Sequence, residues 1–372
     1  MDFNWILIRY GEIGLKSSYV RKSFEKRLME NIRRALKSRD IEGEVQRGYG
    51  RIFINTKEVE KTSEVLKHTF GVVSFSPSIK IESGLEKIVD KLTSAGKEIL
   101  NKKKTFGVRA RRTGNHAYSS KDVEEEAGRK IIEATGAGVD LDNPDERIMA
   151  DIRQGQAYIF TDKVDGPGGL PLGTQGKIIS LFDGGFKSFL ATWLMMKRGC
   201  SVVLLCGEMG PYSSNKNTKE AVELLKKWSH GSPIRVLEFN HGKRLFQISE
   251  DGERGYNCTL CKRFLYRLAD EIAKETKSKA IVTGETINKN FSDFRLWENG
   301  INHPVVRPLV GLDENEIRKK CEEVGAKVLI EGKKCEAEDK ERTEVDKGRL
   351  NDLEGKIGMN NMLKKVKGEV ED

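Results

Sequence analysis

The sequence has 372 residues, 37% of them hydrophobic and 33% charged, and its formal net charge is +9. This length allows two or three domains with separate cores, and the modest basic excess permits a polyanionic partner without requiring one. The N-terminus lacks the cationic start and cleavage site of a secretory signal, and no stretch approaches the roughly 18 apolar residues of a membrane span. Composition therefore argues against secreted and membrane-spanning classes and predicts a cytoplasmic protein.

The first 80 residues follow the order β-α-β-β-α-β, which is the ferredoxin-like pattern. The predicted elements are strands at 5–10, 41–46, 51–55 and 72–81 and helices at 17–39 and 59–68. Apolar residues recur every four positions along 17–39, as in an amphipathic helix, and Gly48 and Gly50 mark a hairpin. We therefore predict an N-terminal ferredoxin-like domain over residues 1–80.

A second small α/β unit is predicted over residues 81–165. Its elements are helices at 85–100 and 121–134 and strands at 105–111, 148–153 and 157–163. The segment that follows, 166–176, is rich in glycine and proline and indicates a linker between domains.

The pattern changes over residues 177–335. The apolar run 178–182 is typical of a strand buried on both faces, and strands then alternate with helices. This alternation predicts a doubly wound parallel α/β sheet that binds its ligand at the carboxyl ends of the strands. The last segment, 336–372, is highly charged. A surface helix is indicated there by Leu350, Leu353, Ile357 and Val366.

The strongest local signal lies where the strand at 178–182 runs into DGGFKS at 183–188. A glycine pair followed by a hydroxyl residue at a helix start gathers backbone N–H groups at the positive end of the helix, which favours an anion. The same residues are also compatible with a tight strand-to-helix turn that binds nothing. This loop is therefore a candidate phosphate site.

Six cysteines in so long a chain do not form a disulfide scaffold, so clustered cysteines are candidates for metal or sulfur chemistry. Cys258 and Cys261 precede a helix predicted from Lys262. The helix N-terminus, with Lys262 and Arg263 nearby, is expected to lower their thiol pKa values. A zinc ribbon would need a second C-x-x-C pair, which the sequence lacks, and Cys335 is the remaining candidate. Packing roles are expected for Cys200, Cys206 and Cys321.

Residues 104–113 place arginines at the end of a predicted strand. Strand alternation puts Arg109 and Arg111 on one face, where they can bind phosphates, and Arg112 follows them. The alternative is a solvated edge strand whose charges prevent aggregation.

Several blocks of the sequence resemble the ThiI group of tRNA 4-thiouridine synthetases. These blocks are GPGGLPLGTQG at 166–176 with LMMKRG at 194–199, TGET at 283–286, RPLVGLD at 307–313, FGVRARRTGNH at 106–116 and RYGEIGLK at 9–16. The block at 106–116 resembles THUMP domains, and the one at 9–16 resembles the ferredoxin-like domain that precedes THUMP in this group. The resemblance covers about residues 1–335.

This resemblance implies an N-terminal α+β arm joined to a PP-loop domain that binds ATP with Mg²⁺. The ATP-binding residues that it assigns are Leu181, Phe182, Asp183, Gly184, Gly185, Ser188, Cys206, Gly207, Lys262, Arg263, Gly284 and Asp293. Three positions depart from the family motifs: Asp183 replaces a serine, Lys187 an aspartate and Asp293 a glutamine. Asp183 and Lys187 are expected either to compensate each other's charge, with Lys187 serving catalysis, or to mark a decayed nucleotide site.

The sequence is similar to the form of the group, common in archaea, that lacks a rhodanese domain and carries C-x-x-C with a third, distant cysteine. Cys258, Cys261 and Cys335 match these positions, which implies catalytic thiols that hold an iron–sulfur cluster with one open iron. A zinc ion, a redox pair and structural thiols are the alternatives.

By the same resemblance, tRNA and a sulfur donor are the partners, and a homodimer is left open. The RNA-binding residues would be Lys16, Arg109, Arg111 and Arg112. The implied activity is ATP-dependent transfer of sulfur to a tRNA uridine, uridine 8 in the family. AMP is attached to the uridine O4, and sulfide or a persulfide on Cys335 then displaces it. The alternative is a non-catalytic RNA-binding relative with a degenerate nucleotide loop.

Overall fold

The computed structural model describes residues 1–210, 216–230, 232–287, 292–331, 335 and 345–370. The chain forms two compact units, Met1–Gly169 and Leu170–Asp372. The boundary falls inside the predicted linker, because Leu170 and Leu172 are already buried within the second unit. No helix among the described residues is long and apolar enough to cross a membrane.

The first unit contains a nine-stranded sheet in the order β2-β3-β1-β4-β8-β7-β5-β6, with β9 paired to β4. Its strands are β1 Trp5–Arg9, β2 Glu44–Gly48, β3 Arg51–Asn55, β4 Ser74–Glu82, β5 Thr105–Arg112, β6 Gly138–Val139, β7 Glu146–Arg153, β8 Gln156–Phe160 and β9 Val164–Asp165. One strand, β4, belongs to both halves: Ser74 to Ser78 pair with β1, and Ile79 to Glu82 pair with β8. The predicted ferredoxin-like and THUMP units are confirmed, and they share a continuous sheet.

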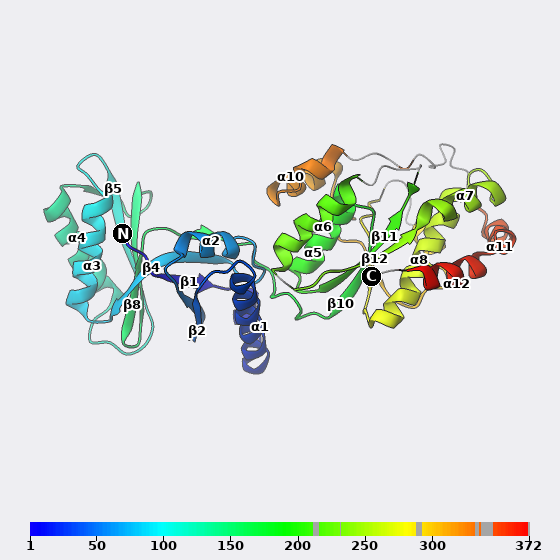
Figure 1. Cartoon of the computed structure of the whole chain (residues 1–372). Helices are drawn as coiled ribbons and strands as arrows, with labels where there is room; N and C mark the ends of the chain where they lie inside the picture. The colour runs from blue at the N-terminus through cyan, green and yellow to red at the C-terminus, as the bar shows by residue number, and fades with distance from the viewer. Residues whose placement is uncertain (211–215, 231, 288–291, 332–334, 336–344, 371–372) are drawn as a thin grey trace. The chain divides into compact units, whose positions relative to one another are not determined.

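Helices cover one face of each half of this sheet (Figure 1). They are α1 Ser18–Lys37, α2 Val59–Leu66, α3 Leu85–Ile99 and α4 Ser120–Thr135, with a short 3-10 helix η1 at Glu12–Leu15. The apolar repeat of α1 buries Leu28, Ile32 and Leu36 against the strands. A capping box between Ser119 and Asp122 begins α4. Arg9 of β1 is among the side chains on the opposite face of the sheet.

The second unit has, within its described residues, a five-stranded parallel sheet in the order β12-β11-β10-β13-β14. Its strands are β10 Lys177–Phe182, β11 Ser201–Glu208, β12 Arg235–Asn240, β13 Ile281–Val282 and β14 Val305–Val306. Its helices are α5 Phe186–Lys197, α6 Lys216–Ser229, α7 His241–Asp251, α8 Asn257–Thr276, α9 Ser292–Trp297, α10 Glu314–Glu323, α11 Lys347–Lys356 and α12 Met359–Glu369, with a 3-10 helix η3 at Lys327–Glu331. The predicted doubly wound parallel sheet is confirmed. We predicted no element between 240 and 257, where α7 forms.

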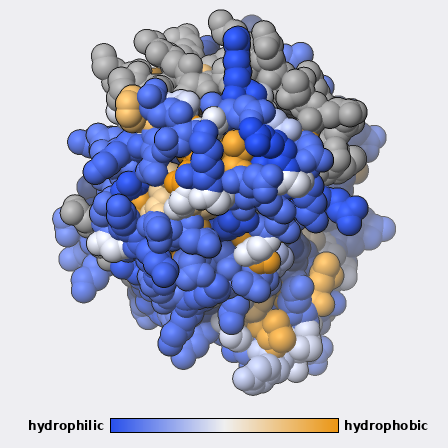
Figure 2. Space-filling view, turned by 90° about the vertical axis from the view of Figure 1, so that its right-hand side faces the viewer, coloured by the Kyte–Doolittle hydropathy of each residue, from blue (hydrophilic) through white to orange (hydrophobic). Residues whose placement is uncertain are grey.

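The C-terminal segment differs from the predicted single surface helix. It forms two helices, α11 and α12, of which α12 packs against α8 (Figure 1). Their apolar side chains are 0–2% exposed and join the core of the second unit: Leu350, Leu353, Ile357, Met359, Met362 and Val366. Each such burial contributes about 1.5–3 kcal/mol of transfer free energy. The end of the second unit that these helices help to form presents a mainly hydrophilic surface (Figure 2).

Candidate functional site

The loop after β10 has the geometry of a narrow strand-to-helix turn. Gly184 adopts a φ of +76°, and Gly185 is the N-cap of α5. A Cβ atom on Gly184 would lie 2.5 Å from Oγ1 and 2.6 Å from Cα of Thr218, at the start of α6. Glycine is required at position 184 both for its backbone conformation and for this close approach.

The carboxylate of Asp183 forms hydrogen bonds within this loop and with the first turn of α5. Its Oδ1 accepts hydrogen bonds from Gly185 N at 2.9 Å and from the Ser188 hydroxyl at 2.5 Å. Lys187 instead forms an ion pair with Glu314 of α10, with Nζ and Oε2 3.2 Å apart. Asp183 and Lys187 therefore do not form the expected ion pair. Asp183 is hydrogen-bonded within its own loop, and Lys187 is paired with Glu314.

The cation that faces this loop is Lys262, in the second turn of α8. Its Nζ lies 2.8 Å from Oε1 of Glu285, and its side chain is 39% exposed. Burial alone would lower the pKa of Lys262, but the negative charges of Glu285 and Asp183 raise it above its usual value. Lys262 is therefore a protonated ammonium, and its partner Glu285 follows Gly284, which packs against Ser188 N at the start of α5. We call the β10 loop together with Lys262 and Glu285 the crevice.

Arg263, the neighbour of Lys262, points into the core. Its side chain is fully buried, its Nε donates to Leu296 O at 2.7 Å, and its Nη1 donates to Glu354 Oε1 at 2.8 Å. The partner Glu354 belongs to α11, in the segment where the sequence indicated a surface helix. We therefore assign Arg263 to the anchoring of the C-terminal helices rather than to the crevice.

Other predicted ATP contacts gather at the carboxyl ends of the parallel strands. Leu181 and Phe182 end β10, and Cys206 pairs in register with Phe182 on β11. Burial raises the pKa of the Cys206 thiol to about 12, and the charges of Glu238 and Asp183 add to this rise.

Two glycines are required by close packing around the crevice. A Cβ on Gly207 would lie 2.8 Å from His241 Cβ, and one on Gly284 would lie 2.6 Å from Ser188 N. Gly284 thus lets the end of β13 approach the first turn of α5.

The predicted ATP contact Asp293 lies in the first turn of α9, but its side chain is outside those that the structure describes.

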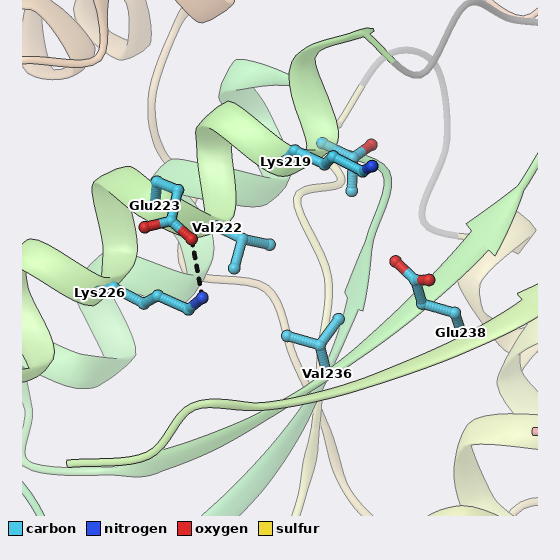
Figure 3. A pocket seen from close by; sticks show the side chains of 7 residues that line it. Lys219, Val222, Glu223, Lys226, Val236 and Glu238 are labelled. Atoms are coloured by element: carbon cyan, nitrogen blue, oxygen red, sulfur yellow. Dashed lines mark hydrogen bonds and ion pairs between the residues drawn. The ribbon is translucent and has the colours of Figure 1, made fainter. Parts of the chain in front are cut away.

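A groove of about 500 Å³ opens beside the loop, between α6 and β12 (Figure 3). Its lining residues are Thr218, Lys219, Val222, Glu223, Lys226, Val236 and Glu238. Glu223 and Lys226 pair at 2.7 Å on α6, and Glu238 projects from β12. Thr218 connects the groove to the loop, because its hydroxyl donates to Asp183 O at 3.4 Å. No sequence pattern indicates this groove, which depends on the packing of α6.

The cysteines of the C-x-x-C pair lie inside the first turns of α8 rather than before it. Burial raises the pKa of the Cys261 thiol to about 12, and the nearby charges of Cys335 and Cys258 contribute to the rise. The predicted lowering is therefore wrong for Cys261, because loss of solvent outweighs Lys262. The three thiols interact electrostatically, although no three His, Cys, Asp or Glu side chains in the described part of the chain are arranged to hold a metal ion.

His241 is a residue of this region that the sequence reasoning missed. It begins α7, stacks on Phe264 and is 4% exposed. Its Nε2 lies 3.3 Å from Cys261 Sγ. Burial, assisted by the charge of Lys262, lowers the pKa of His241 to about 4, so the imidazole is neutral.

Cys321 is one of the cysteines that we expected to have a packing role. Its side chain is fully buried, and its Sγ lies 3.5 Å from Phe186 O.

The predicted RNA-binding residues of the first unit are exposed. Arg109 Nη2 donates to Leu141 O at 2.7 Å, and Arg112 Nη1 donates to His116 O at 3.4 Å. Lys16 follows η1 in the ferredoxin-like half. Backbone acceptors thus orient two of the guanidinium groups without neutralising their charge.

A second set of arginines, which we call the arginine seam, lies where the two halves of the first unit meet. It comprises Arg9 on β1, Arg51 on β3, Arg111 on β5 and Arg153 on β7. Arg9 interacts electrostatically with the other three and with Asp151, which is 2% exposed. Arg153 pairs with this carboxylate, and Arg51 Nε lies 3.5 Å from Oδ2. Burial and the other arginines lower the pKa of Arg9 to about 10, which leaves it charged at neutral pH.

The arginine seam holds four cations around one buried carboxylate, so it carries an unbalanced positive charge that a polyanion would offset. Beside it, Tyr49 is 80% exposed, its carbonyl accepts from Arg153 Nη1 at 2.9 Å, and Arg21 lies 5.8 Å from its ring centroid. Sequence reasoning missed Arg9, Arg51 and Arg153 because only strand pairing brings them together.

Comparison with known families supports three parts of the chain. Residues 5–76 match the ThiI ferredoxin-like domain, residues 82–162 match the THUMP domain, and residues 173–341 match the family described as thiamine biosynthesis protein (ThiI). The chain is 36% identical over 339 residues to a probable tRNA sulfurtransferase of Methanobrevibacter smithii, with 87% of each chain covered. It is 37% identical over 336 residues to one of Thermococcus kodakarensis, covering 87% of this chain and 88% of the relative.

Two solved structures are similar over most of the chain. A crystal structure of a 4-thiouridine synthetase–RNA complex with bound ATP matches with a TM-score of 0.89 at 28% identity, covering 99% of this chain and 98% of the other. The crystal structure of PH1313 from Pyrococcus horikoshii matches with a TM-score of 0.70 at 31% identity, covering 87% of this chain and 99% of the other.

Proposed function

The chain belongs to the ThiI family of tRNA sulfurtransferases, and from that premise we propose that it converts a tRNA uridine, uridine 8 by resemblance, to 4-thiouridine through an adenylated intermediate. The observation that carries this proposal is the arrangement around α8. Cys258, Cys261 and Lys262 lie on the first two turns of α8, and Lys262 pairs with Glu285, which follows the glycine packed against Ser188 N at the start of α5. A cation for the triphosphate and thiols for the sulfur are thereby held next to each other.

Adenylation is the step that the β10 loop serves in this proposal. The amides at the start of α5 and the ammonium of Lys262 would stabilise the negative charge that develops as pyrophosphate leaves. Mg²⁺ commonly uses one or two carboxylates together with substrate phosphates, and Asp183 offers such a carboxylate at the loop. With the cation in place, Asp183 would attract rather than repel the triphosphate.

The thiols serve the second step. In one route hydrosulfide attacks C4 of the adenylated uridine, loses its proton, and AMP departs with the former O4, with no change of oxidation state. In the alternative route the terminal sulfur of a persulfide on Cys335 attacks C4 and AMP departs. A second thiol then attacks Cys335 Sγ, which releases the thiouridine and leaves a disulfide that an external thiol donor reduces. Three cysteine thiolates are the donor set of an iron–sulfur cluster with one open iron, which would supply a place for sulfide. We propose Cys258, Cys261 and Cys335 as its ligands on the chemistry of these donors, which must move closer together to share a metal.

RNA binding falls to the first unit. The arginine seam and the exposed arginines of β5 lie on one unit, and guanidinium groups bind phosphates in a bidentate way. The exposed ring of Tyr49 adds a surface on which a base can stack. A sulfur donor, sulfide or a persulfide carrier, completes the reaction.

A second candidate function is a non-catalytic RNA-binding relative. The observation in its favour is Asp183, whose carboxylate occupies loop donors that a phosphate would use. Titration with radiolabelled ATP and Mg²⁺ separates the two functions. We expect saturable binding by the wild type, loss of binding in Gly185→Asp, and loss in the presence of EDTA. No saturable binding by the wild type would leave the non-catalytic function standing.

The cluster has its own test. After anaerobic purification we expect brown protein with visible absorption in the wild type and colourless protein in Cys258→Ala. Metal analysis that finds zinc, or no metal, in the wild type would reject the cluster while leaving ATP binding untouched.

A further inference from the structure

Glu285, of the segment TGET, collects polar groups from three parts of the second unit. Its carboxylate accepts from Lys262 Nζ at 2.8 Å, from Arg307 Nε at 3.2 Å and from the Thr283 hydroxyl at 3.2 Å. The hydroxyl of Tyr266, one turn beyond Lys262 on α8, also donates to it. One carboxylate thus joins α8, the end of β13 and the segment that follows β14.

This carboxylate is held much more firmly than the lysine that it contacts. Glu285 is 13% exposed, and Tyr266 is fully buried beneath it. Arg307 is itself held, because its Nη1 pairs with Glu298 and its Nη2 donates to Tyr266 at 2.9 Å. Burial alone would raise the pKa of Glu285, but Lys262 and its other partners lower it, so the group stays ionised.

Lys262 by contrast has a flexible stem, and although the charge of Asp183 also acts on it, its ion pair is with Glu285, at 2.8 Å. Only Glu285 forms a direct ion pair with it among the described residues. Without the charge of Glu285, the attraction of Asp183 on the ammonium would no longer be opposed. The direction of Lys262 is therefore decided by Glu285.

We propose that Glu285 is a positioning residue, which aims the Lys262 ammonium at the triphosphate and keeps it away from Asp183. This inference rests on the proposed function, because it requires ATP in the crevice. It assigns Glu285 no contact with the nucleotide, so that its whole contribution to nucleotide binding passes through Lys262.

A double-mutant cycle tests this dependence directly. The dissociation constant of Mg-ATP is measured by calorimetry for the wild type, Glu285→Gln, Lys262→Met and the double variant. We expect Glu285→Gln to weaken binding about tenfold in the wild type and less than about twofold in the Lys262→Met background. An equal loss in both backgrounds overturns the proposal, because it would mean that Glu285 acts through the fold.

Glu298→Gln is the matched control. It is the same chemical change on the same network, since Glu298 also pairs with Arg307, but it does not contact Lys262. We expect its Mg-ATP affinity to stay within about twofold of the wild type, because it leaves the ion pair intact. A loss as large as that of Glu285→Gln counts against the proposal.

Folding and the proposed function are checked separately. Thermal unfolding shows whether Glu285→Gln is folded, and if it is not, Glu285→Asp replaces it in the cycle. The aspartate keeps the buried charge but is one methylene shorter, so we expect a smaller loss that again disappears beside Lys262→Met. An equal loss in both backgrounds overturns the proposal here too. Absence of Mg-ATP binding by the wild type refutes the proposed function, whereas binding with additive losses refutes only the role of Glu285.

Discussion

The arginine seam and the nucleotide crevice handle positive charge in opposite ways. At the seam, four guanidinium groups surround one carboxylate, Asp151. At the crevice, Lys262 is paired with Glu285 and Lys187 with Glu314. The seam therefore has more positive than negative charge, although most of its arginines are only partly exposed, whereas the lysines of the crevice are already paired.

This difference indicates two kinds of anion recognition. Unbalanced charge attracts a polyanion over a distance and is screened by salt. Paired charge contributes little net attraction, but it fixes the direction of an ammonium before the nucleotide arrives, as electrostatic catalysis requires. The first unit should therefore determine how tightly RNA is bound, and the second should determine whether the bound RNA is modified.

The largest expected effect separates chemistry from binding. Cys335→Ser removes the sulfur-carrying thiol, so we expect the rate of 4-thiouridine formation to fall more than about hundredfold. The affinities for RNA and Mg-ATP should stay within about twofold, because neither the seam nor the β10 loop is altered. The measurements are thiouridine absorbance, filter binding and calorimetry. Cys200→Ala, a buried cysteine near α5, is the control, and a Cys335→Ser protein that still thiolates tRNA would refute the assignment.

Salt should distinguish the two anion sites in the wild type. If about four phosphates are contacted, raising KCl from about 50 to 200 mM should weaken RNA binding about hundredfold. Mg-ATP binding at the crevice should change less than about threefold, because its cations are already paired. Fluorescence anisotropy for RNA and calorimetry for Mg-ATP give both slopes. Equal salt dependence of the two ligands would remove the distinction between seam and crevice.

Removal of seam arginines should reduce RNA affinity alone. We expect Arg9→Ala and Arg153→Ala each to weaken RNA binding about tenfold. The slope of log affinity against log salt concentration should become shallower by about one for each phosphate contact that is lost. Arg129→Ala is the matched control, since Arg129 pairs with Glu133 on the surface of α4. RNA affinity that falls as much in this control as in the seam variants would show that general charge, rather than the seam, binds RNA.

The smallest expected effect concerns the shape of the β10 loop. Gly184→Ala places a methyl group against Thr218 and forces a left-handed conformation that costs about 1–2 kcal/mol. We expect Mg-ATP affinity to fall about fivefold to tenfold with RNA affinity unchanged. Gly311→Ala has open space around its Cβ and serves as the control. Equal affinities in the two variants would mean that the loop does not contact the nucleotide.

Local sequence patterns predicted much of this fold. The apolar run and the glycine pair predicted β10 and the turn into α5, and the alternation of strands and helices predicted the parallel sheet. The capping box that Asp313 and Glu316 form at the start of α10 follows from a spacing of three residues in the sequence. These features depend on neighbours in the sequence, so a single chain is sufficient to predict them.

Features that depend on distant residues were not predictable. Lys187 was expected near Asp183, but packing of α10 against α5 supplies Glu314 instead. The pKa of Cys261 was expected to fall, but α7 places His241 and its surroundings over the thiol and removes water. The arginine seam requires β3 beside β1 and β7 beside β5. Each correction arises from a contact between segments that no local pattern connects.

The sharing of β4 between two folds has a mechanical consequence for the RNA arm. A strand that pairs with β1 through Ser78 and with β8 from Ile79 leaves no flexible joint between the ferredoxin-like and THUMP halves. Rotation of one half against the other would break ladder hydrogen bonds on both sides of this point. The two halves of the first unit should therefore move together as one rigid body, with the spacing between their exposed cations fixed by the shared strand.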